Sequence, residues 1–369
     1  MKPSVVIFIS NPFGFGPTGK TVALIEELYK VWPGKIVYAA SPMCLETLPE
    51  YMRKKIQIEN IDERNEDSLR LIYKKYDNPL IVCTLNRLAI RTAKSMNLKA
   101  IFVDSLAWMW KEIPSEYLMA DTYYCFNLFG LKDRIQKREN IKVISPVFGI
   151  LPRVQTKKES FVLFRIGGFK NPFQDKMSFA YLNLLVDSFS SFKQETKVVV
   201  TGGKDAITYM NSRISNNNFS FCTLGRNEFL QHLNKSSHFV TTSGLTATLE
   251  AFALRAPTSF IPPTNLSQLN ILKLMSDRGC ADSRMDWSSI IGSEINFDDL
   301  SEIEAVPIFN RVAEKAFNNK TSHDCFVMDL NSLLTNIPDS TKQTDFIKDA
   351  GINGSETIVA DLLPQFSTL

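Results

Sequence analysis

The stretch HFVTTSGLTATLEAFALRAPTSFIPPTNLSQLN, residues 238–270, decides the fold that we predict for this chain. A buried strand runs into a tight turn at Gly244, and a helix over 245–254 follows, with Thr242 or Ser243 expected as its cap. A glycine at such a turn lets a ligand approach the backbone closely, and the N–H groups at the helix start favour an anion. The stretch therefore predicts a diphosphate site, although a plain strand–helix–strand unit with a capped helix has the same pattern.

Polar side chains on this helix and after the next strand extend the predicted site. Thr246 and Glu250 lie four residues apart and share one helix face, from which Glu250 can accept hydrogen bonds from ribose hydroxyls. The loop opened by two prolines then carries the amides Asn265, Gln268 and Asn270, which suit sugar hydroxyls. The stretch thus points to a nucleotide-linked sugar.

Short apolar runs alternate with helical patterns along the first half of the chain. Continuous apolar strands joined by helices are typical of a parallel, doubly wound sheet. The predicted strands are 5–9, 35–39, 80–83, 100–103, 122–125 and 142–144, and the predicted helices are 20–31, 66–76 and 86–96.

A second α/β pattern begins after a proline- and glycine-marked segment that leads into a polar linker at 155–160. We expect a domain over 1–153, a second over 154–343, and a C-terminal helix within 344–369 that returns to the first domain. The fold class is therefore α/β, with two Rossmann-like domains facing each other across a cleft that closes by a hinge near 147–153. Predicted strands are 161–166, 197–200, 219–222, 238–241 and 258–261, with a long helix from about 177.

Composition excludes several classes of protein. The 369 residues are 44% hydrophobic and 22% charged, with a formal net charge of only +3, which argues against a dedicated nucleic-acid binder. Six dispersed cysteines without metal-type spacing indicate reduced thiols. No apolar run is long enough to span a bilayer, and the short N-terminal run is typical of a strand. We therefore expect a cytoplasmic protein.

The stretch at 238–270 resembles the donor half of GT-B glycosyltransferases, in the branch of the UDP-glycosyltransferases and the GlcNAc transferase that forms lipid II. The resemblance covers nearly the whole chain in its order of elements, but only about 30 residues in motif detail. It implies a diphosphate site, a ribose-binding carboxylate and a sugar-binding amide loop. It also implies a glycine loop after the first strand of the second domain, where phenylalanine replaces the usual hydroxyl residue, and a base-binding segment at 223–225. The implied donor-binding residues are Gly167, Gly168, Leu224, Gly225, Ser243, Gly244, Thr246, Glu250, Gln268 and Asn270.

The resemblance further implies an inverting hexosyl transfer from a nucleotide diphosphate sugar, with UDP as the nucleotide. The chain has no Asp-x-Asp, so we expect metal independence and no cofactor. The residue eight positions before Glu250 is Thr242, whereas retaining relatives often have a glutamate there. The partners would be a nucleotide sugar and a small-molecule or lipid-linked acceptor, with a hydroxyl or nitrogen as the attacking group.

The facing side of the site is predicted at the first strand of the chain and at the strand over 100–103. Lys20 stands where many relatives place a catalytic histidine, and the three histidines lie elsewhere. Asp104, at a strand end, is the replacement base that we predict, or else a structural carboxylate. Lys20 is predicted to neutralise the charge of the diphosphate, or else to be a solvated residue of the first helical turn. Arg165 either faces the phosphates or reaches solvent. The acceptor-side loop and pocket comprise Gly14, Gly16, Gly19 and Trp108.

The glycine-rich segment of the acceptor-side loop also supports a competing hypothesis. GFGPTGKT, residues 14–21, matches the Walker A pattern between a strand and a helix, which would make the chain a P-loop NTPase or kinase. Pro17 weakens this hypothesis because it has no N–H to give to a phosphate. A sugar-nucleotide epimerase and a non-catalytic nucleotide-sugar sensor are the further alternatives.

Overall fold

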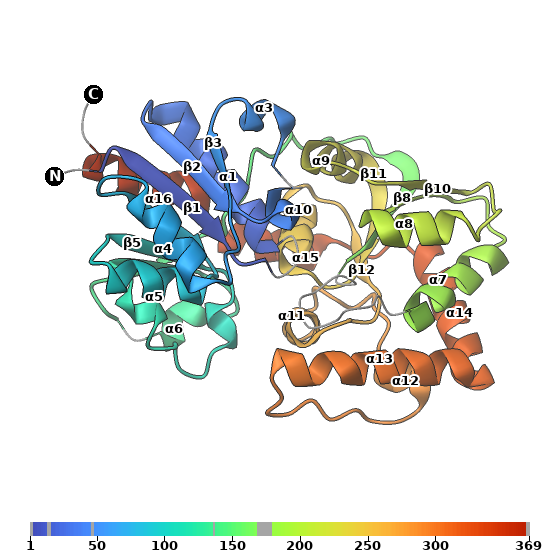
Figure 1. The fold of residues 1–369 in the computed structure, drawn as a ribbon. Helices are drawn as coiled ribbons and strands as arrows, with labels where there is room; N and C mark the ends of the chain where they lie inside the picture. Colours follow the sequence, from blue (N-terminus) through green and yellow to red (C-terminus); the bar gives the residue numbers. More distant parts are fainter. Residues whose placement is uncertain (1–2, 13–15, 46–47, 136, 168–178, 367–369) are drawn as a thin grey trace. The chain divides into compact units, whose positions relative to one another are not determined.

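The computed structural model describes residues 3–12, 16–45, 48–135, 137–167 and 179–366, and it divides the chain into two units (Figure 1). Unit 1 comprises Met1–Ile150 and Asp349–Leu369, and unit 2 comprises Leu151–Lys348. Each unit is built on a parallel sheet with helices in its connections. The α/β class with two Rossmann-like units, expected from the sequence, is confirmed.

The sheet of unit 1 has the strand order β3-β2-β1-β4-β5-β6-β7, and every described pairing is parallel. Its central strands are buried along their whole length, as expected where helices cover both faces. The strands are β1 (Val5–Ser10), β2 (Lys35–Ala40), β3 (Gln57–Asn60), β4 (Leu80–Thr84), β5 (Ala100–Asp104), β6 (Thr122–Phe126) and β7 (Ile141–Ile144).

The helices of unit 1 connect successive strands, and the connection between β5 and β6 contains two short 3₁₀ turns. Asparagine side chains cap α4 and α5 by accepting from backbone N–H groups of the first turn, which explains where these helices begin. The helices are α1 (Gly16–Val31), α2 (Pro42–Leu45), α3 (Glu50–Arg53), α4 (Glu66–Lys74), α5 (Arg87–Ser95) and α6 (Leu131–Arg134), with η1 (Ala107–Met109) and η2 (Tyr117–Met119).

The C-terminal segment forms two helices where the sequence suggested one. The first, α15 (Thr341–Ala350), ends before Gly351, whose φ of +78° is left-handed and stops the helix. The second, α16 (Gly354–Leu362), followed by η3 (Leu363–Gln365), packs on α1 of unit 1, so that red and blue segments lie together in Figure 1. Asp361 of α16 accepts hydrogen bonds from Tyr124 and Lys142 at the β6–β7 edge, at 3.0 and 2.6 Å.

The sheet of unit 2 has the strand order β10-β9-β8-β11-β12, again with parallel pairings. The strands are β8 (Glu159–Ile166), β9 (Lys197–Gly202), β10 (Phe219–Cys222), β11 (Ser236–Thr241) and β12 (Thr258–Phe260). The helices are α7 (Phe179–Ser191), α8 (Lys204–Asn211), α9 (Arg226–Lys235), α10 (Leu245–Ala253), α11 (Leu266–Ser276), α12 (Trp287–Ile291), α13 (Glu302–Asn318) and α14 (Lys320–Thr335).

One large apolar core lies between this sheet and the helices α7, α13 and α14. Its aromatic members include Phe164 of β8, Phe189 of α7 and Phe326 of α14, each with no exposed surface. Phe164 and Phe189 meet edge to face, with their ring centroids 5.0 Å apart. This packing fixes the position of β8 against α7.

In each sheet the chain first adds strands toward one edge and then crosses over to add strands toward the other edge. The switch point lies between the two adjacent strands from which these two series start. These strands are β1 and β4 in unit 1, and β8 and β11 in unit 2. Ligands of doubly wound folds bind outside the carboxyl ends of the strands at such a switch point. The decisive stretch of sequence begins on β11 and is therefore placed at the switch point of unit 2.

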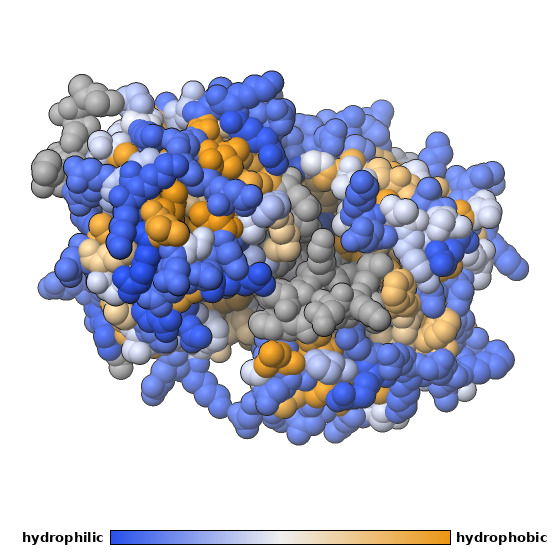
Figure 2. All heavy atoms as spheres, viewed as in Figure 1, coloured by the Kyte–Doolittle hydropathy of each residue, from blue (hydrophilic) through white to orange (hydrophobic). Residues whose placement is uncertain are grey.

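The face shown in Figure 2 is hydrophilic over most of its area, with hydrophobic residues in separate groups. Single exposed apolar side chains, such as Leu71 and Met328, are ordinary on a protein surface. Among the helices of the described residues, none is long and apolar enough to cross a membrane. All six cysteines lie in described segments, and none of them forms a disulfide there.

Candidate functional site

The site predicted in unit 2 is assembled where β8 and β11 end side by side. Arg165 of β8 is in register with Thr241 of β11, so the residues that follow them are neighbours. The Thr242 hydroxyl donates to the carbonyl of Gly167 at 3.5 Å, and a Cβ on Gly167 would come within 3.2 Å of that hydroxyl. Gly167 therefore permits a close approach of the two loops. Gly168 lies outside the described residues.

Helix α10 begins without a side-chain cap, which corrects the expectation that Thr242 or Ser243 caps it. Its N-cap is Gly244, and the two hydroxyls are used elsewhere, since Ser243 donates to the carbonyl of Gln268 at 2.7 Å. Apart from its own neighbours in the chain, no described atom lies within 4 Å of a Cβ placed on Gly244. An uncapped helix start with space above its glycine is suited to an anion. Thr246 lies in the first turn and is partly buried.

The amide residues expected in a loop after β12 lie at the start of α11 instead, with Gln268 and Asn270 inside the helix, and this segment contacts the same edge. The Gln268 side chain accepts from the backbone and hydroxyl of Thr264, at 2.8 and 3.0 Å, and donates to the Thr242 hydroxyl at 3.3 Å. Both ends of its amide are thus engaged, one with Thr264 and the other with the turn after β11, and Asn265 caps α11. Asn270, two residues further along α11, is partly buried. The segment is preorganised, and a sugar at Gln268 has to share or replace these bonds.

Glu250 lies on the second turn of α10, with only 2% of its side chain exposed. Its Oε1 atom is 2.9 Å from a guanidinium nitrogen of Arg226, the first residue of α9. The segment predicted to bind the base directly precedes Arg226, with Leu224 partly buried and Gly225, the N-cap of α9, exposed. The predicted ribose and base positions are therefore adjacent. Arg226, which the sequence did not suggest as a site residue, connects them because it follows the base segment and contacts Glu250.

Arg165 neither reaches freely into solvent nor stands alone. Its guanidinium lies 4.2 Å above the ring of Phe229 in α9, a cation–π contact. Burial lowers the pKa of Arg165, the field of Glu250 raises it, and the field of Arg226 lowers it. Two arginines and one carboxylate thus form one charge cluster at this edge.

In unit 1, helix α1 takes up most of the segment that was expected to be a glycine-rich loop. The helix begins at Gly16, so Gly16, Gly19 and Lys20 are helical, and a proline in its first turn favours this start. Lys20 is 4% exposed and donates to the Gly16 carbonyl at 3.2 Å. Thr21 is fully buried and donates to Thr84 of β4. Gly14 lies outside the described residues.

This helix corrects the Walker A hypothesis. A phosphate loop needs Gly19, Lys20 and Thr21 to present N–H, ammonium and hydroxyl groups to a nucleotide. Here Gly19 lies inside the helix, and the Thr21 hydroxyl is bonded into the core. The match of letters is not accompanied by the geometry that the motif requires.

Asp104 ends β5 and has no exposed surface. Its carboxylate accepts from the Tyr123 hydroxyl at 2.7 Å, the Trp110 indole N–H at 3.1 Å and the Leu106 backbone N–H at 2.6 Å. Burial raises the pKa of Asp104, while these three donors and the field of Lys20 lower it. The Asp104 carboxylate therefore lies at the carboxyl edge of the sheet, as predicted, and it accepts hydrogen bonds from three donors of the surrounding chain.

The remaining aromatic and histidine candidates are packed in the interior or paired. Trp108 is 4% exposed, donates to the Ser105 carbonyl and packs edge-on against Phe129, as expected of a core residue. His238 is fully buried on β11 with Nε2 2.8 Å from the Ser259 hydroxyl. Burial lowers the pKa of His238 to about 4.

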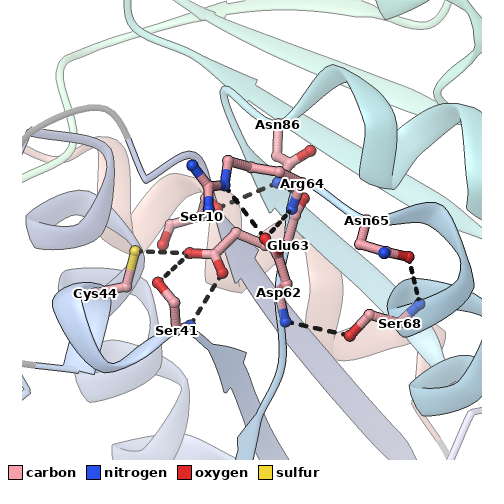
Figure 3. Close-up of polar contacts among 9 residues, drawn as sticks. All are labelled: Ser10, Ser41, Cys44, Asp62, Glu63, Arg64, Asn65, Ser68 and Asn86. Atoms are coloured by element: carbon pink, nitrogen blue, oxygen red, sulfur yellow. Dashed lines mark hydrogen bonds and ion pairs between the residues drawn. The ribbon is translucent and has the colours of Figure 1, made fainter. Parts of the chain in front are cut away.

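A second buried carboxylate, Glu63, lies at the carboxyl edge of unit 1 and was not found from the sequence (Figure 3). It accepts from the backbone N–H and hydroxyl of Ser41, at 3.0 and 2.8 Å, and from the Cys44 thiol at 2.9 Å. Asn86 donates to the carbonyls of Glu63 and Ser10, which ties the loop after β3 to β1. This network joins the residues that follow β2, β3 and β4 to the end of β1.

Comparison with known proteins identifies the fold. No protein-family profile and no curated protein matches the chain by sequence. Solved structures match over nearly its whole length. Acinetobacter baumannii MurG is similar with a TM-score of 0.54 and 12% identity over 98% of this chain and 100% of that one. The calicheamicin glycosyltransferase CalG4 is similar with a TM-score of 0.55 and 12% identity, over 99% of this chain and 98% of that one. Arabidopsis thaliana UGT89C1 complexed with UDP is similar with a TM-score of 0.56 and 12% identity, over 98% of this chain and 100% of that one.

These similarities show that the chain has the GT-B fold, in which two Rossmann-like domains follow one another along the chain. The resemblance stated from the sequence is confirmed at the level of the fold. At 12% identity the residues of the site must be argued from the chain itself.

Proposed function

We propose that the chain is a glycosyltransferase that takes a sugar from a nucleotide diphosphate sugar, with UDP as the nucleotide, and inverts the anomeric centre. The observation that carries the proposal is the edge of unit 2 at the β8–β11 switch point. There the turn that leads into the uncapped start of α10 at Gly244 contacts Gly167 through the Thr242 hydroxyl, and the buried carboxylate of Glu250 lies on the same helix. These features suit a diphosphate and a ribose respectively.

In this proposal unit 2 binds the donor. N–H groups at the start of α10 stabilise the charge that develops on the departing diphosphate, and they are fixed in place before the reaction. Leu224 and Gly225 border the base, Thr246 supports the diphosphate, and Gln268 and Asn270 meet the sugar. Because the sequence has no Asp-x-Asp, the reaction is proposed to need no metal ion.

The acceptor side is proposed in unit 1. Asp104 takes the proton of the attacking hydroxyl or nitrogen, a role that suits a carboxyl whose pKa burial raises. Access to Asp104 then requires its loop, which contains Trp110, to open, since the carboxylate is fully buried. Lys20 is proposed to offset diphosphate charge, and the acceptor is a small molecule or a lipid-linked glycan.

The experiment is turnover of a panel of UDP-, TDP- and GDP-sugars with a library of acceptors, followed by chromatography of nucleotide and sugar. We expect release of UDP that depends on the acceptor and is lost in Glu250→Gln. An isomerised sugar nucleotide without UDP release would identify an epimerase instead. Binding of sugar nucleotides that are returned unchanged with every acceptor would indicate a sensor.

A further inference from the structure

The cluster of Arg165, Arg226 and Glu250 contains a buried charge that is only partly satisfied. A carboxylate offers about four acceptor positions. Within the described residues, the polar neighbour of the Glu250 carboxylate is Arg226, at 2.9 Å from Oε1, and this contact lacks the alignment of a hydrogen bond. A carboxylate that is 2% exposed and so sparsely bonded has capacity left for a ligand.

The position of Arg226 determines which oxygen of the Glu250 carboxylate is left to accept hydrogen bonds from a ligand. Arg226 is itself only 11% exposed, and it follows the exposed Gly225 at the start of α9. Its guanidinium reaches across to α10 and contacts one oxygen of Glu250, which limits the rotamers that the glutamate can adopt. The desolvation of the two charges offsets most of their attraction, so a buried ion pair adds little to the stability of the fold. Its effect here is to fix the orientation of the Glu250 carboxylate.

Arg165 supplies the second cation of the cluster. It is held by the ring of Phe229 and lies in the fields of both Glu250 and Arg226. With two guanidinium groups and one carboxylate, the cluster has a formal charge of +1. The charge of Glu250 is therefore still compensated when a ligand hydroxyl approaches its second oxygen.

We propose that Arg226 is a positioning residue for nucleoside recognition: it fixes one carboxylate oxygen of Glu250 so that the other accepts hydrogen bonds from the vicinal diol of a ribose. The inference rests on the proposed function, and it adds the residue that makes the site selective for a ribonucleotide. Glu250 held in advance loses little rotamer freedom on binding, which favours affinity. A site built to accept a hydroxyl discriminates strongly against a ligand that lacks it.

The test compares UDP with 2′,3′-dideoxy-UDP by isothermal titration calorimetry. The wild-type chain should prefer UDP by at least about 10-fold, as expected when hydroxyl bonds to a charged group are lost. Arg226→Met should reduce this preference to within about 3-fold by weakening UDP alone, because the diphosphate and base contacts remain. Arg226→Lys should retain part of the preference. Arg213→Met is the matched control, since Arg213 is an exposed arginine of unit 2 that stacks on Tyr209.

Equal weakening of both nucleotides by Arg226→Met would overturn the inference, because Arg226 would then contact phosphate or base directly. An unchanged preference would overturn it as well. If Arg226→Met does not fold, Arg226→Met/Glu250→Gln removes the uncompensated charge, and it should bind the two nucleotides alike. A wild-type chain that binds no UDP contradicts the proposed function itself, whereas UDP binding that depends on Glu250 but not on Arg226 contradicts only the inference.

Discussion

Lowering the pH from 7 to 5 should cost the chain about 2 kcal/mol of stability through one side chain, His238. The imidazole is fully buried on β11, its Nε2 contacts the Ser259 hydroxyl, and its Nδ1 has no partner among the described residues. Protonation would place a charge and an unsatisfied donor in the core. Burial accordingly lowers the pKa of His238 from 6.5 to about 4.

The sign follows from the lowered pKa. Above pH 6.5 the imidazole is neutral in both states and the stability is fully present. Between 6.5 and about 4 the unfolded chain binds a proton that the folded chain does not, so stability falls as the pH falls. The whole interval corresponds to roughly 3 kcal/mol, of which about 2 kcal/mol is lost by pH 5.

The assay is urea unfolding of the wild type, His238→Gln and His232→Gln at pH 7, 6 and 5. We expect the wild type and His232→Gln to lose stability in parallel, because His232 is only half-buried on α9, where its Nδ1 contacts the Glu228 carbonyl and its ring packs edge-on against Phe161. His238→Gln should lose about 2 kcal/mol less than they do over the same range. Equal pH dependence of all three proteins would refute this account of the buried imidazole.

Three further predictions test the rest of the structure. Asp104→Asn should lower kcat by about 100-fold or more and leave the Kd of UDP within about 3-fold, as for a general base; a kcat within about 10-fold of the wild type would contradict that role. Asp361→Ala should lower stability by about 1 kcal/mol and expose the C-terminal helix to limited proteolysis, since its bonds to β6 and β7 are lost; unchanged cleavage would contradict it. Magnesium-ATP should leave the Tm of the wild type and of Lys20→Met unchanged, because α1 absorbs the glycine-rich segment; a rise in the wild type that Lys20→Met abolishes would restore the NTPase hypothesis.

The sequence predicts the sheets well where strands are apolar and poorly where they are not. Eleven of the twelve strands described here start or end within a few residues of an expected run, because apolar residues such as Val, Ile and Phe dominate most of them. Strand β3, with the sequence QIEN, is short and polar and gives no such signal. Because β3 is not predicted, the sequence also gives no reason to place Glu63, in the loop after that strand, as a buried carboxylate at the carboxyl edge of the sheet.

For the candidate site, the sequence predicts the helices and turns that carry the residues, but not the contacts that these residues make. Gly244 and Glu250 could be placed on a turn and a helix because capping and helical spacing are local rules. The hydroxyl of Ser243 instead bonds to the Gln268 carbonyl, 25 residues further along the chain, and Arg226 reaches Glu250 from another helix. Such partners depend on which strands are neighbours, which local patterns do not encode.

The most direct test of the proposed function is calorimetric titration of UDP into the wild-type chain and Glu250→Gln, each in EDTA and again with magnesium. The account predicts that the wild type binds UDP equally well in both buffers and that Glu250→Gln binds at least about 10-fold more weakly. Absence of UDP binding, or equal affinity in the two proteins, would contradict the claim that the β8–β11 edge of unit 2 is the donor site.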